Sequence, residues 1–226
     1  MIKAITLFLL SYCTLSAYTI DEVQKLVVEV STNIHTLEGW CSVEKGLSLV
    51  ELVLEVKPKT YVEIGVFGGR SLYPVAAAIK LIGDEKAKVI AIDPWDRFEC
   101  VKYYDPTKDE AHLRWWGSLN IDYIYTSYLA MLSRFGLQNY VKTIRATSKK
   151  AALEIGEIDI LHIDGNHSRL VSTLDVVLYL PKVRKGGYIW MNDIVSDRTE
   201  AVELLKESCD IVKNVDKNNC ILFRKR

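Results

Sequence analysis

Two short segments place carboxylate, amide and imidazole side chains directly after apolar runs. Asp164 and His167 follow one run, and Asn192 and Asp193 follow the next. If the two runs are neighbouring parallel strands, their carboxyl ends meet at one edge of a sheet and bring these side chains together. Asp164, Asn192 and Asp193 would then form an all-oxygen ligand set, which suits a hard cation such as magnesium.

His167 lies three residues after Asp164, at the predicted entrance of a helix. A neutral imidazole there can accept a proton near neutral pH, so His167 is a candidate general base. Asp164 is the second candidate catalytic residue, because a metal that it binds would hold and acidify a neighbouring group. The alternative is structural: Asp164 and Asp193 cap turns and His167 closes the loop. His162 falls inside the apolar run and is predicted to be a hydrogen-bonded core residue.

A glycine-rich turn follows the first predicted strand. Glycine permits a backbone geometry and a close approach that a side chain would block, and ligands bind outside the carboxyl ends of such strands. The nicotinamide fingerprint requires glycine at its first, third and sixth positions, but counted from Gly65 these later positions are Phe67 and Arg70. The sequence therefore disfavours a dinucleotide dehydrogenase.

The turn instead matches the pattern Glu-x-Gly-x-x-x-Gly at Glu63, Gly65 and Gly69. Asp93 ends the next predicted strand, where its carboxylate can accept hydrogen bonds from both hydroxyls of a ribose. The two features on consecutive strands indicate a ligand that carries a ribose.

Short apolar strands alternate with helices over most of the chain, which indicates a parallel sheet covered on both faces. Two helices precede the first strand, and Ser71 is predicted to cap the helix that follows the glycine-rich turn. The last two strands are predicted to form a hairpin. The predicted strands span residues 61–66, 89–92, 141–145, 158–163, 188–191, 211–215 and 220–224, and the predicted helices include 19–36, 43–56 and 72–82.

With these motifs in this order, the sequence resembles the class I S-adenosylmethionine-dependent methyltransferases from about residue 46 to the C-terminus. The resemblance implies an α/β fold: a Rossmann-like, doubly wound, seven-stranded sheet, mostly parallel with an antiparallel C-terminal hairpin, and helices on both faces. It implies that the backbone around Gly65 follows the methionine part, that Asp93 holds the ribose, and that Trp95 or the segment 147–148 borders the adenine. Phe67 departs from the family pattern, where many members have a third glycine. The cofactor-binding residues implied are Glu63, Gly65, Gly69, Ser71, Asp93, Trp95 and Ser148.

The segments around Asp164 and Asp193 also resemble the family branch that contains metal-dependent O-methyltransferases of the catechol and macrolide type and the cephalosporin hydroxylase proteins. This implies methyl transfer to a hydroxyl of a small molecule, with Asp164, Asn192 and Asp193 as magnesium ligands. Two alternatives stay open. One is a noncatalytic or scaffold protein that retains the fold. The other is an oxygenase like the hydroxylase relatives, although the sequence shows no separate motif of two histidines and a carboxylate.

An aromatic-rich insertion at about 96–124 separates the second and third predicted strands of the sheet. It contains Phe98, Tyr103, Trp115 and Trp116. Long connections within compact domains are often functional lids. Equally, Trp115 and Trp116 could simply anchor an extra helix.

The N-terminal segment 1–17 has a basic residue, an apolar run and small residues before a cleavage point, as in a signal peptide. We therefore expect export to the periplasm or the exterior, with no stable membrane span once the signal is cleaved. A membrane-tethered or cytoplasmic protein with an uncleaved segment is the alternative. Residues 18–57 are predicted to form a helical cover, and residues 58–226 the S-adenosylmethionine-binding domain. Beyond Cys13, four scattered cysteines are expected to form one disulfide at most.

Charge balance limits the partners of this chain. Its 226 residues carry 29 basic and 29 acidic side chains, so the formal net charge is zero. A nucleic-acid-binding domain would normally show a basic excess, so none is expected here. The predicted partner is a small-molecule acceptor, neutral or ring-bearing, and a homo-oligomer is possible.

Overall fold

The computed structural model describes residues 18–194, 199–215 and 219–226. The predicted signal segment 1–17, Cys13 and most of the predicted hairpin turn lie outside these residues. Among the described helices, none has the length and apolar character needed to cross a lipid bilayer.

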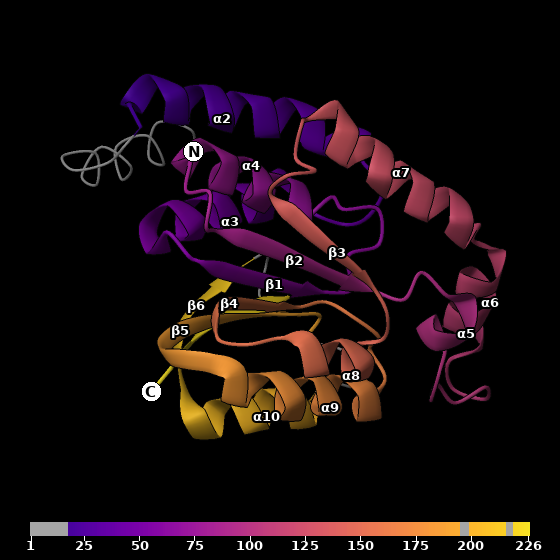
Figure 1. The fold of residues 1–226 in the computed structure, drawn as a ribbon. Helices are drawn as coiled ribbons and strands as arrows, with labels where there is room; N and C mark the ends of the chain where they lie inside the picture. Colours follow the sequence, from indigo (N-terminus) through magenta and orange to yellow (C-terminus); the bar gives the residue numbers. More distant parts are fainter. Residues whose placement is uncertain (1–17, 195–198, 216–218) are drawn as a thin grey trace.

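A seven-stranded sheet forms the centre of the molecule, with the order β3-β2-β1-β4-β5-β7-β6 (Figure 1). The first five strands in this order are parallel, and β7 is antiparallel to both of its neighbours. The predicted Rossmann-like sheet with an antiparallel C-terminal end is therefore confirmed. The strands are β1 (Thr60–Ile64), β2 (Lys88–Asp93), β3 (Val141–Arg145), β4 (Ile158–Ile163), β5 (Val183–Asn192), β6 (Cys209–Val215) and β7 (Cys220–Lys225).

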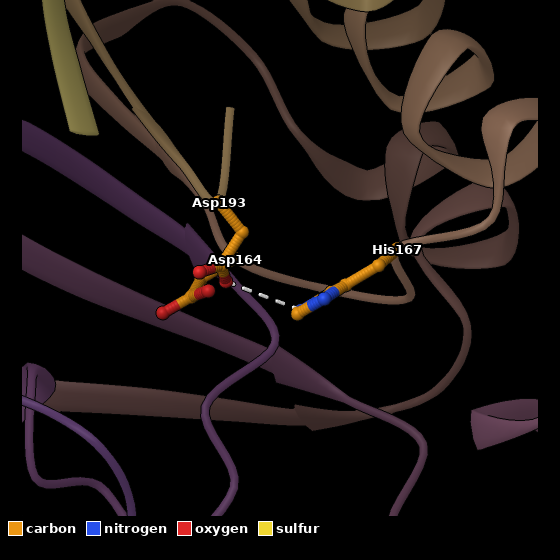
Figure 2. Close-up of side chains that lie close together, drawn as sticks. All are labelled: Asp164, His167 and Asp193. Atoms are coloured by element: carbon orange, nitrogen blue, oxygen red, sulfur yellow. Dashed lines mark ion pairs between the residues drawn. The ribbon is translucent and has the colours of Figure 1, made fainter. Parts of the chain in front are cut away.

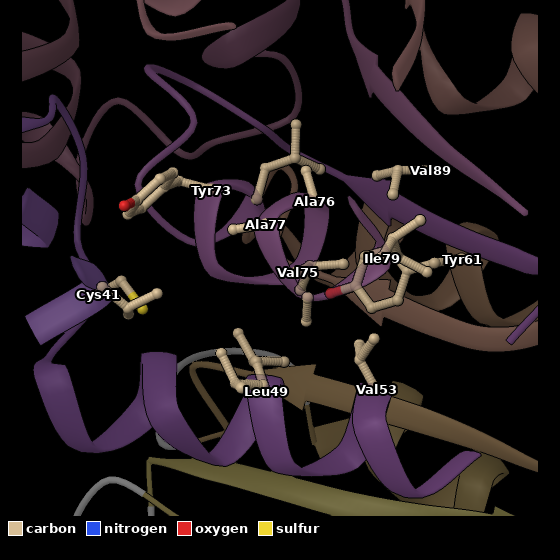
Figure 3. Close-up of a cluster of buried hydrophobic side chains, with 14 of the residues drawn as sticks. Cys41, Leu49, Val53, Tyr61, Tyr73, Val75, Ala76, Ala77, Ile79 and Val89 are labelled. Atoms are coloured by element: carbon tan, nitrogen blue, oxygen red, sulfur yellow. The ribbon is translucent and has the colours of Figure 1, made fainter. Parts of the chain in front are cut away.

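Helices cover both faces of the sheet (Figure 1). Two buried clusters correspond to the two faces, and Figure 3 shows part of the first, where Leu49 and Val53 lie near Val75 and Ile79. One face carries α2 (Ile20–Asn33), α3 (Val43–Val56), α4 (Leu72–Ile82) and α7 (Ile121–Arg134), and the other carries α8 (Ser148–Ala151), α9 (Arg169–Tyr179) and α10 (Thr199–Ser208).

The central strands are almost entirely buried, as expected when helices cover both faces of a parallel sheet. Their apolar residues fill the two clusters, but β1 and β4 each contain a buried polar residue, Glu63 and His162. These two residues are direct partners in the register of the two strands. A polar pair thus lies inside the sheet, and burial of such groups requires hydrogen bonds.

Local sequence signals fix several helix ends. Thr19 opens α2 through a capping box with Glu22, in which each side chain bonds the backbone of the other residue. Ser71 does not cap α4, contrary to the prediction, because its hydroxyl donates a hydrogen bond to the carboxylate of Glu63 instead.

The predicted insertion at 96–124 contains two helices, α5 (Arg97–Cys100) and α6 (Glu110–Ser118), and then the start of α7. The residues of α7 enter the first buried cluster through Ile124 and Tyr128. The insertion proper therefore ends before α7, which is a structural helix of the sheet's cover. The short 3-10 helices are η2 (Ile34–Thr36), η3 (Ala152–Glu154) and η4 (Leu180–Lys182).

The four cysteines within the described residues are free thiols. Cys41 and Cys209 are buried in the two clusters. Burial raises the pKa of Cys41 to about 12 and also raises the pKa of Cys209. These cysteines are small buried side chains, as the sequence favours.

The burial of these thiols predicts their reactivity. Iodoacetamide should leave Cys41 and Cys209 unmodified in the folded protein and modify both after unfolding in guanidinium, because only an exposed thiolate attacks the reagent. Peptide-level mass spectrometry before and after unfolding measures this. Rapid modification of either cysteine in the folded protein would contradict the described packing.

Candidate active site

A cavity of about 1480 Å³ opens at the carboxyl ends of the parallel strands. Its wall includes Asp93, the last residue of β2, and the residues that directly follow β1, β4 and β5, namely Gly65, Asp164 and Asp193. β1 and β4 are neighbours, but the chain leaves β1 toward β2 and leaves β4 toward β5, which opens a crevice at this edge. The glycine-rich turn and the acidic cluster therefore border the same cavity.

Gly65 brings two backbone segments into close contact. It has a φ of 85°, and a Cβ at this position would overlap the carbonyl group of Asp164. The same two loops are joined by a hydrogen bond of 2.8 Å from the Asp164 N–H to the Ile64 carbonyl. Gly69 has a φ of 86°, and a Cβ there would meet the side chain of Met131. Gly65 is required by the neighbouring backbone as well as by its own backbone angle, whereas at Gly69 the backbone angle is the main requirement because the Met131 side chain is flexible.

Phe67 keeps the shape of this turn although it replaces a glycine of the family pattern. Its φ is 52°, in the left-handed region that glycine adopts most easily. Its N–H donates to Asp93 Oδ2 at 2.9 Å, and its ring packs against Trp40 and Trp116. The hydrogen bond and the ring contacts stabilise a conformation that the backbone alone disfavours.

Asp93 is buried beside the turn, with its carboxylate at the cavity. Oδ2 accepts from the Phe67 N–H and Oδ1 accepts from the Trp95 N–H at 2.7 Å. Burial raises the pKa of Asp93, although these N–H groups oppose the rise. A carboxylate has about four acceptor sites. Asp93 therefore holds the turn and has acceptor sites left for ligand hydroxyls, and its contact with a ribose stays a prediction.

Trp95 and Ser148 lie on the cavity wall beyond Asp93. Trp95 is stacked on Tyr128, and its indole N–H donates to the Phe67 carbonyl at 2.8 Å. Ser148 begins α8, and its carbonyl accepts from the Tyr179 hydroxyl. Both residues are thus held by the protein at positions where a ligand base could pack, and their contact with adenine stays a prediction.

Glu63 supports the turn from below instead of facing the cavity. Its side chain is 0% exposed, and Oε1 accepts from the Ser71 hydroxyl at 2.6 Å. Oε2 lies 3.2 Å from His162 Nδ1. Ser71 borders the cavity, so the predicted cofactor role of Glu63 would act through Ser71 and the turn. His162 is buried and hydrogen-bonded, which confirms it as a core histidine.

Asp164, His167 and Asp193 converge at the other end of the cavity (Figure 2). One ligand atom from each residue lies within 4.8 Å of those of the other two. His167 Nε2 is 3.3 Å from Asp193 Oδ2, and the His167 backbone N–H donates to the Tyr104 hydroxyl. Asp193 itself has a φ of 52°. The sequence therefore identified all three residues, and the structure pairs the histidine with a carboxylate that can orient it.

The amide oxygen of Asn192 points away from this cluster, and its predicted role as a metal ligand stays a prediction. The side chain is 4% exposed, and Oδ1 faces the Trp190 indole N–H at 3.0 Å, His162 Nε2 at 3.3 Å and Cys220 Sγ at 3.1 Å. An indole nitrogen can only donate, so the amide oxygen must point inward. The amide nitrogen points outward and donates to Asp164 Oδ2 at 2.5 Å.

Lys45 of α3 is a residue of this site that the sequence analysis missed. It is 3% exposed, and its Nζ lies 3.5 Å from Asp164 Oδ2 at the cavity wall. A signal was present, because Lys45 lies one helical turn before Leu49 and two turns before Leu52, on the apolar face of the helix. A lysine on such a face either extends to solvent or meets a buried carboxylate, and here it meets Asp164.

The predicted magnesium site does not fit these side chains well. Magnesium prefers oxygen ligands in octahedral geometry. Asn192 presents a nitrogen, and Asp164 Oδ2 already accepts hydrogen bonds from that nitrogen and from the Lys45 ammonium. The set that remains, Asp164, His167 and Asp193, contains an imidazole. The described residues therefore do not reproduce the predicted oxygen-only set.

Four aromatic rings from three segments close the side of the cavity. Each of these aromatic rings contacts two of the others. The centroid distances are 5.1 Å for Trp40–Phe67, 6.1 Å for Phe67–Trp116, 5.0 Å for Trp116–Trp115 and 5.2 Å for Trp115–Trp40. Trp40 is nevertheless 62% exposed. The insertion thus contacts the glycine-rich turn through Trp116. This contact supports the prediction that the tryptophans anchor a helix of the insertion. The same rings form an apolar wall of the cavity.

Asn166 ties the other end of the insertion to the reaction centre. Its amide nitrogen donates to the backbone carbonyls of Glu99, Cys100 and Lys102 at 3.1 to 3.2 Å. Asn166 directly precedes His167 in the chain. Its hydrogen bonds to the insertion therefore also restrict the backbone that carries the His167 imidazole. No sequence pattern indicates these hydrogen bonds between distant segments.

Comparison with known proteins agrees with this geometry. Residues 62–194 match the methyltransferase domain family. No curated protein matches the chain by sequence. The match runs from β1 to the residue after Asp193, so it includes both the glycine-rich turn and the acidic cluster.

Several solved methyltransferases share the fold. The chain resembles the SAH-bound methyltransferase PaMTH1 of Podospora anserina, with a TM-score of 0.62, 15% identity, and coverage of 89% of this chain and 88% of that one. It also resembles the O-methyltransferase TomG of Streptomyces achromogenes in complex with SAM, with a TM-score of 0.59, 14% identity, and coverage of 98% and 94%. An O-methyltransferase of Bacillus cereus in complex with SAH has a TM-score of 0.57, 14% identity, and coverage of 100% of both chains.

The strand order and the crevice define a class I methyltransferase fold. By its sequence match, the chain belongs to the methyltransferase domain family.

The contact at Gly65 predicts a large effect of a small change. Gly65→Ala should lower the free energy of unfolding by about 2 kcal/mol or more, because the methyl group overlaps the Asp164 carbonyl at a positive φ. Urea denaturation measures this. Gly156→Ala is the matched control, since a Cβ there has open space, and it should change stability by less than about 1 kcal/mol. Equal stability of the Gly65 variant and the wild type would contradict the described contact between the loops.

Proposed function

We propose that this chain transfers a methyl group from S-adenosylmethionine to a hydroxyl group of a small molecule. One observation carries the proposal: a single continuous cavity is bordered by Asp93 beyond β2 and by the His167 and Asp193 pair beyond β4 and β5. A cofactor held at the first position would direct its reactive end toward the second. Two of the similar structures contain SAH and one contains SAM, which supports this choice of cofactor.

The cofactor half of the proposal depends on the turn after β1. Gly65 lets the chain pass close to β4, and the Asp93 carboxylate holds the Phe67 N–H. In the proposed complex, Asp93 accepts hydrogen bonds from the ribose hydroxyls. The methionine part lies along Gly65 and the adenine lies between Trp95 and Ser148.

The transfer half depends on His167. Its Nε2 faces the Asp193 carboxylate, so in a neutral imidazole that donates from Nε2 the basic lone pair is on Nδ1, the atom proposed to accept the hydroxyl proton. As that proton moves to the imidazole, the hydroxyl oxygen attacks the methyl carbon and the carbon–sulfur bond breaks. The electron pair stays on sulfur. The protein mainly aligns the two reactants for in-line displacement.

The acceptor is proposed to be a small neutral or ring-bearing molecule. Phe67, Trp115 and Trp116 give the cavity an apolar wall near the reaction centre. Flat rings pack well against such walls through offset or edge contacts. Assistance by magnesium was part of the sequence prediction, and the ligand set described above gives it limited support.

The two alternatives differ from this proposal in measurable ways. A noncatalytic protein could keep the fold without the reaction, whereas the paired His167 and Asp193 at the cavity favour catalysis. An oxygenase would typically use two histidines and one carboxylate to hold iron. Within the described residues, the cluster at the cavity has one histidine and two carboxylates.

Calorimetry and a transfer assay test the proposal together. The wild type should bind S-adenosylmethionine, and with methyl-labelled cofactor it should modify a member of a panel of phenols and alcohols. His167→Gln should retain cofactor affinity and lower turnover by about 10² to 10⁴-fold, because it removes the base. The control His35→Gln, at an exposed residue of the cavity edge, should retain both.

Two results would oppose the proposal. Absence of cofactor binding at millimolar concentration would remove the methyltransferase function. Undiminished turnover of His167→Gln would remove His167 as the base while leaving the cofactor site in place.

A further inference from the structure

We propose that Lys45 supplies the fixed positive charge of the reaction centre, so that methyl transfer by this chain requires no divalent metal. The chemistry of this inference rests on the proposed function. Its principal test measures metal binding and does not depend on turnover.

Lys45 is held at the site by burial and by one ion pair. The side chain comes from the first turn of α3, is 3% exposed and reaches the cavity wall next to Asp164. Its ammonium lies 3.5 Å from Asp164 Oδ2. A buried charge of this kind is retained only when it is paired. The ion pair therefore holds a cation at this end of the cavity.

Asp164 is already satisfied on the oxygen that a metal would share. Its Oδ2 accepts hydrogen bonds from Lys45 Nζ and from Asn192 Nδ2. The amide cannot turn its oxygen toward a metal, because Trp190 and His162 hold that oxygen inside. Two donors, one of them charged, thus already bind Asp164 Oδ2 and compete with a cation for this oxygen.

The charges at the site lead to the same conclusion. Asp164 and Asp193 together carry two negative charges, and Lys45 offsets one of them. A divalent ion bound to Asp164 would lie close to the ammonium, and like charges only a few ångströms apart repel strongly in a partly buried site. With Lys45 present, the binding of a divalent ion at this site is therefore expected to be weak.

Lys45 can also act on the reacting oxygen. An ammonium has three N–H donors, and among the described residues the polar partner of Nζ is Asp164. The other donors can stabilise negative charge on the acceptor oxygen as its proton moves to His167. The oxygen–methyl bond then forms, the sulfur–methyl bond breaks, and the neutral thioether leaves with its electron pair.

Manganese binding followed by electron paramagnetic resonance tests this inference, because Mn²⁺ reports directly on a divalent site. The wild type should bind Mn²⁺ weakly. Lys45→Met removes the charge with a side chain of similar length and should bind Mn²⁺ at least about tenfold more tightly. Adding Asp164→Asn to that variant should abolish the gain. Lys45→Arg keeps the charge and should behave as the wild type.

Lys102→Met is the matched control, since Lys102 also borders the cavity but pairs with Glu99. It should leave Mn²⁺ binding unchanged. Tight, site-specific binding of Mn²⁺ by the wild type would overturn the inference without any variant. Equal affinity of the wild type and Lys45→Met would overturn it as well. If Lys45→Met does not fold, the wild-type measurement still decides.

Activity gives a second measurement once an acceptor is found. Turnover of the wild type should be unchanged after exhaustive treatment with EDTA, whereas Lys45→Met should lose at least about tenfold in kcat and Lys45→Arg should recover part of that loss. Loss of wild-type turnover on EDTA treatment, restored by magnesium, would contradict the role of Lys45 but leave the methyltransferase function intact.

Discussion

A chain of polar contacts across three strands connects the two halves of this site. It runs from the Ser71 hydroxyl through Glu63, His162 and Asn192 to Asp164, with distances of 2.6, 3.2, 3.3 and 2.5 Å, and the Glu63–His162 link is an ion-pair contact. Glu63, His162 and Asn192 lie on β1, β4 and β5, so neighbouring strands place them side by side. Leaving any of these buried groups unpaired would cost free energy, so the chain restricts the whole edge to one arrangement.

This restriction determines the chemistry at the cavity. Because the Asn192 oxygen is used inside the sheet, its nitrogen reaches Asp164, and the carboxylate there is paired with Lys45. At the other end of the chain, Ser71 is bonded to Glu63 beneath the glycine-rich turn. Strained backbone also gathers around the cavity, where Phe67 and Asp193 have positive φ, as is common at functional sites.

The fold and the parts of the site that depend on local pattern could be predicted from the sequence. The parallel sheet follows from the alternation of strands and helices, its seven strands follow from the family resemblance, and the carboxyl-end positions of Asp93, Asp164 and Asp193 follow from the strands. The direction of the Asn192 amide could not be predicted, because it depends on Trp190, two residues earlier, and on His162 of another strand. Lys45 was missed for a similar reason: its partner is 119 residues away in the chain.

The proposed mechanism requires that one cavity align a cofactor between Asp93 and the His167 end. A crystal structure of the protein with S-adenosylhomocysteine, the unreactive product, would show this alignment. We expect the ribose hydroxyls to bond the Asp93 carboxylate and the sulfur to face the space between His167 and Lys45. A ligand bound with its ribose away from Asp93, or with its sulfur directed away from His167, would contradict it.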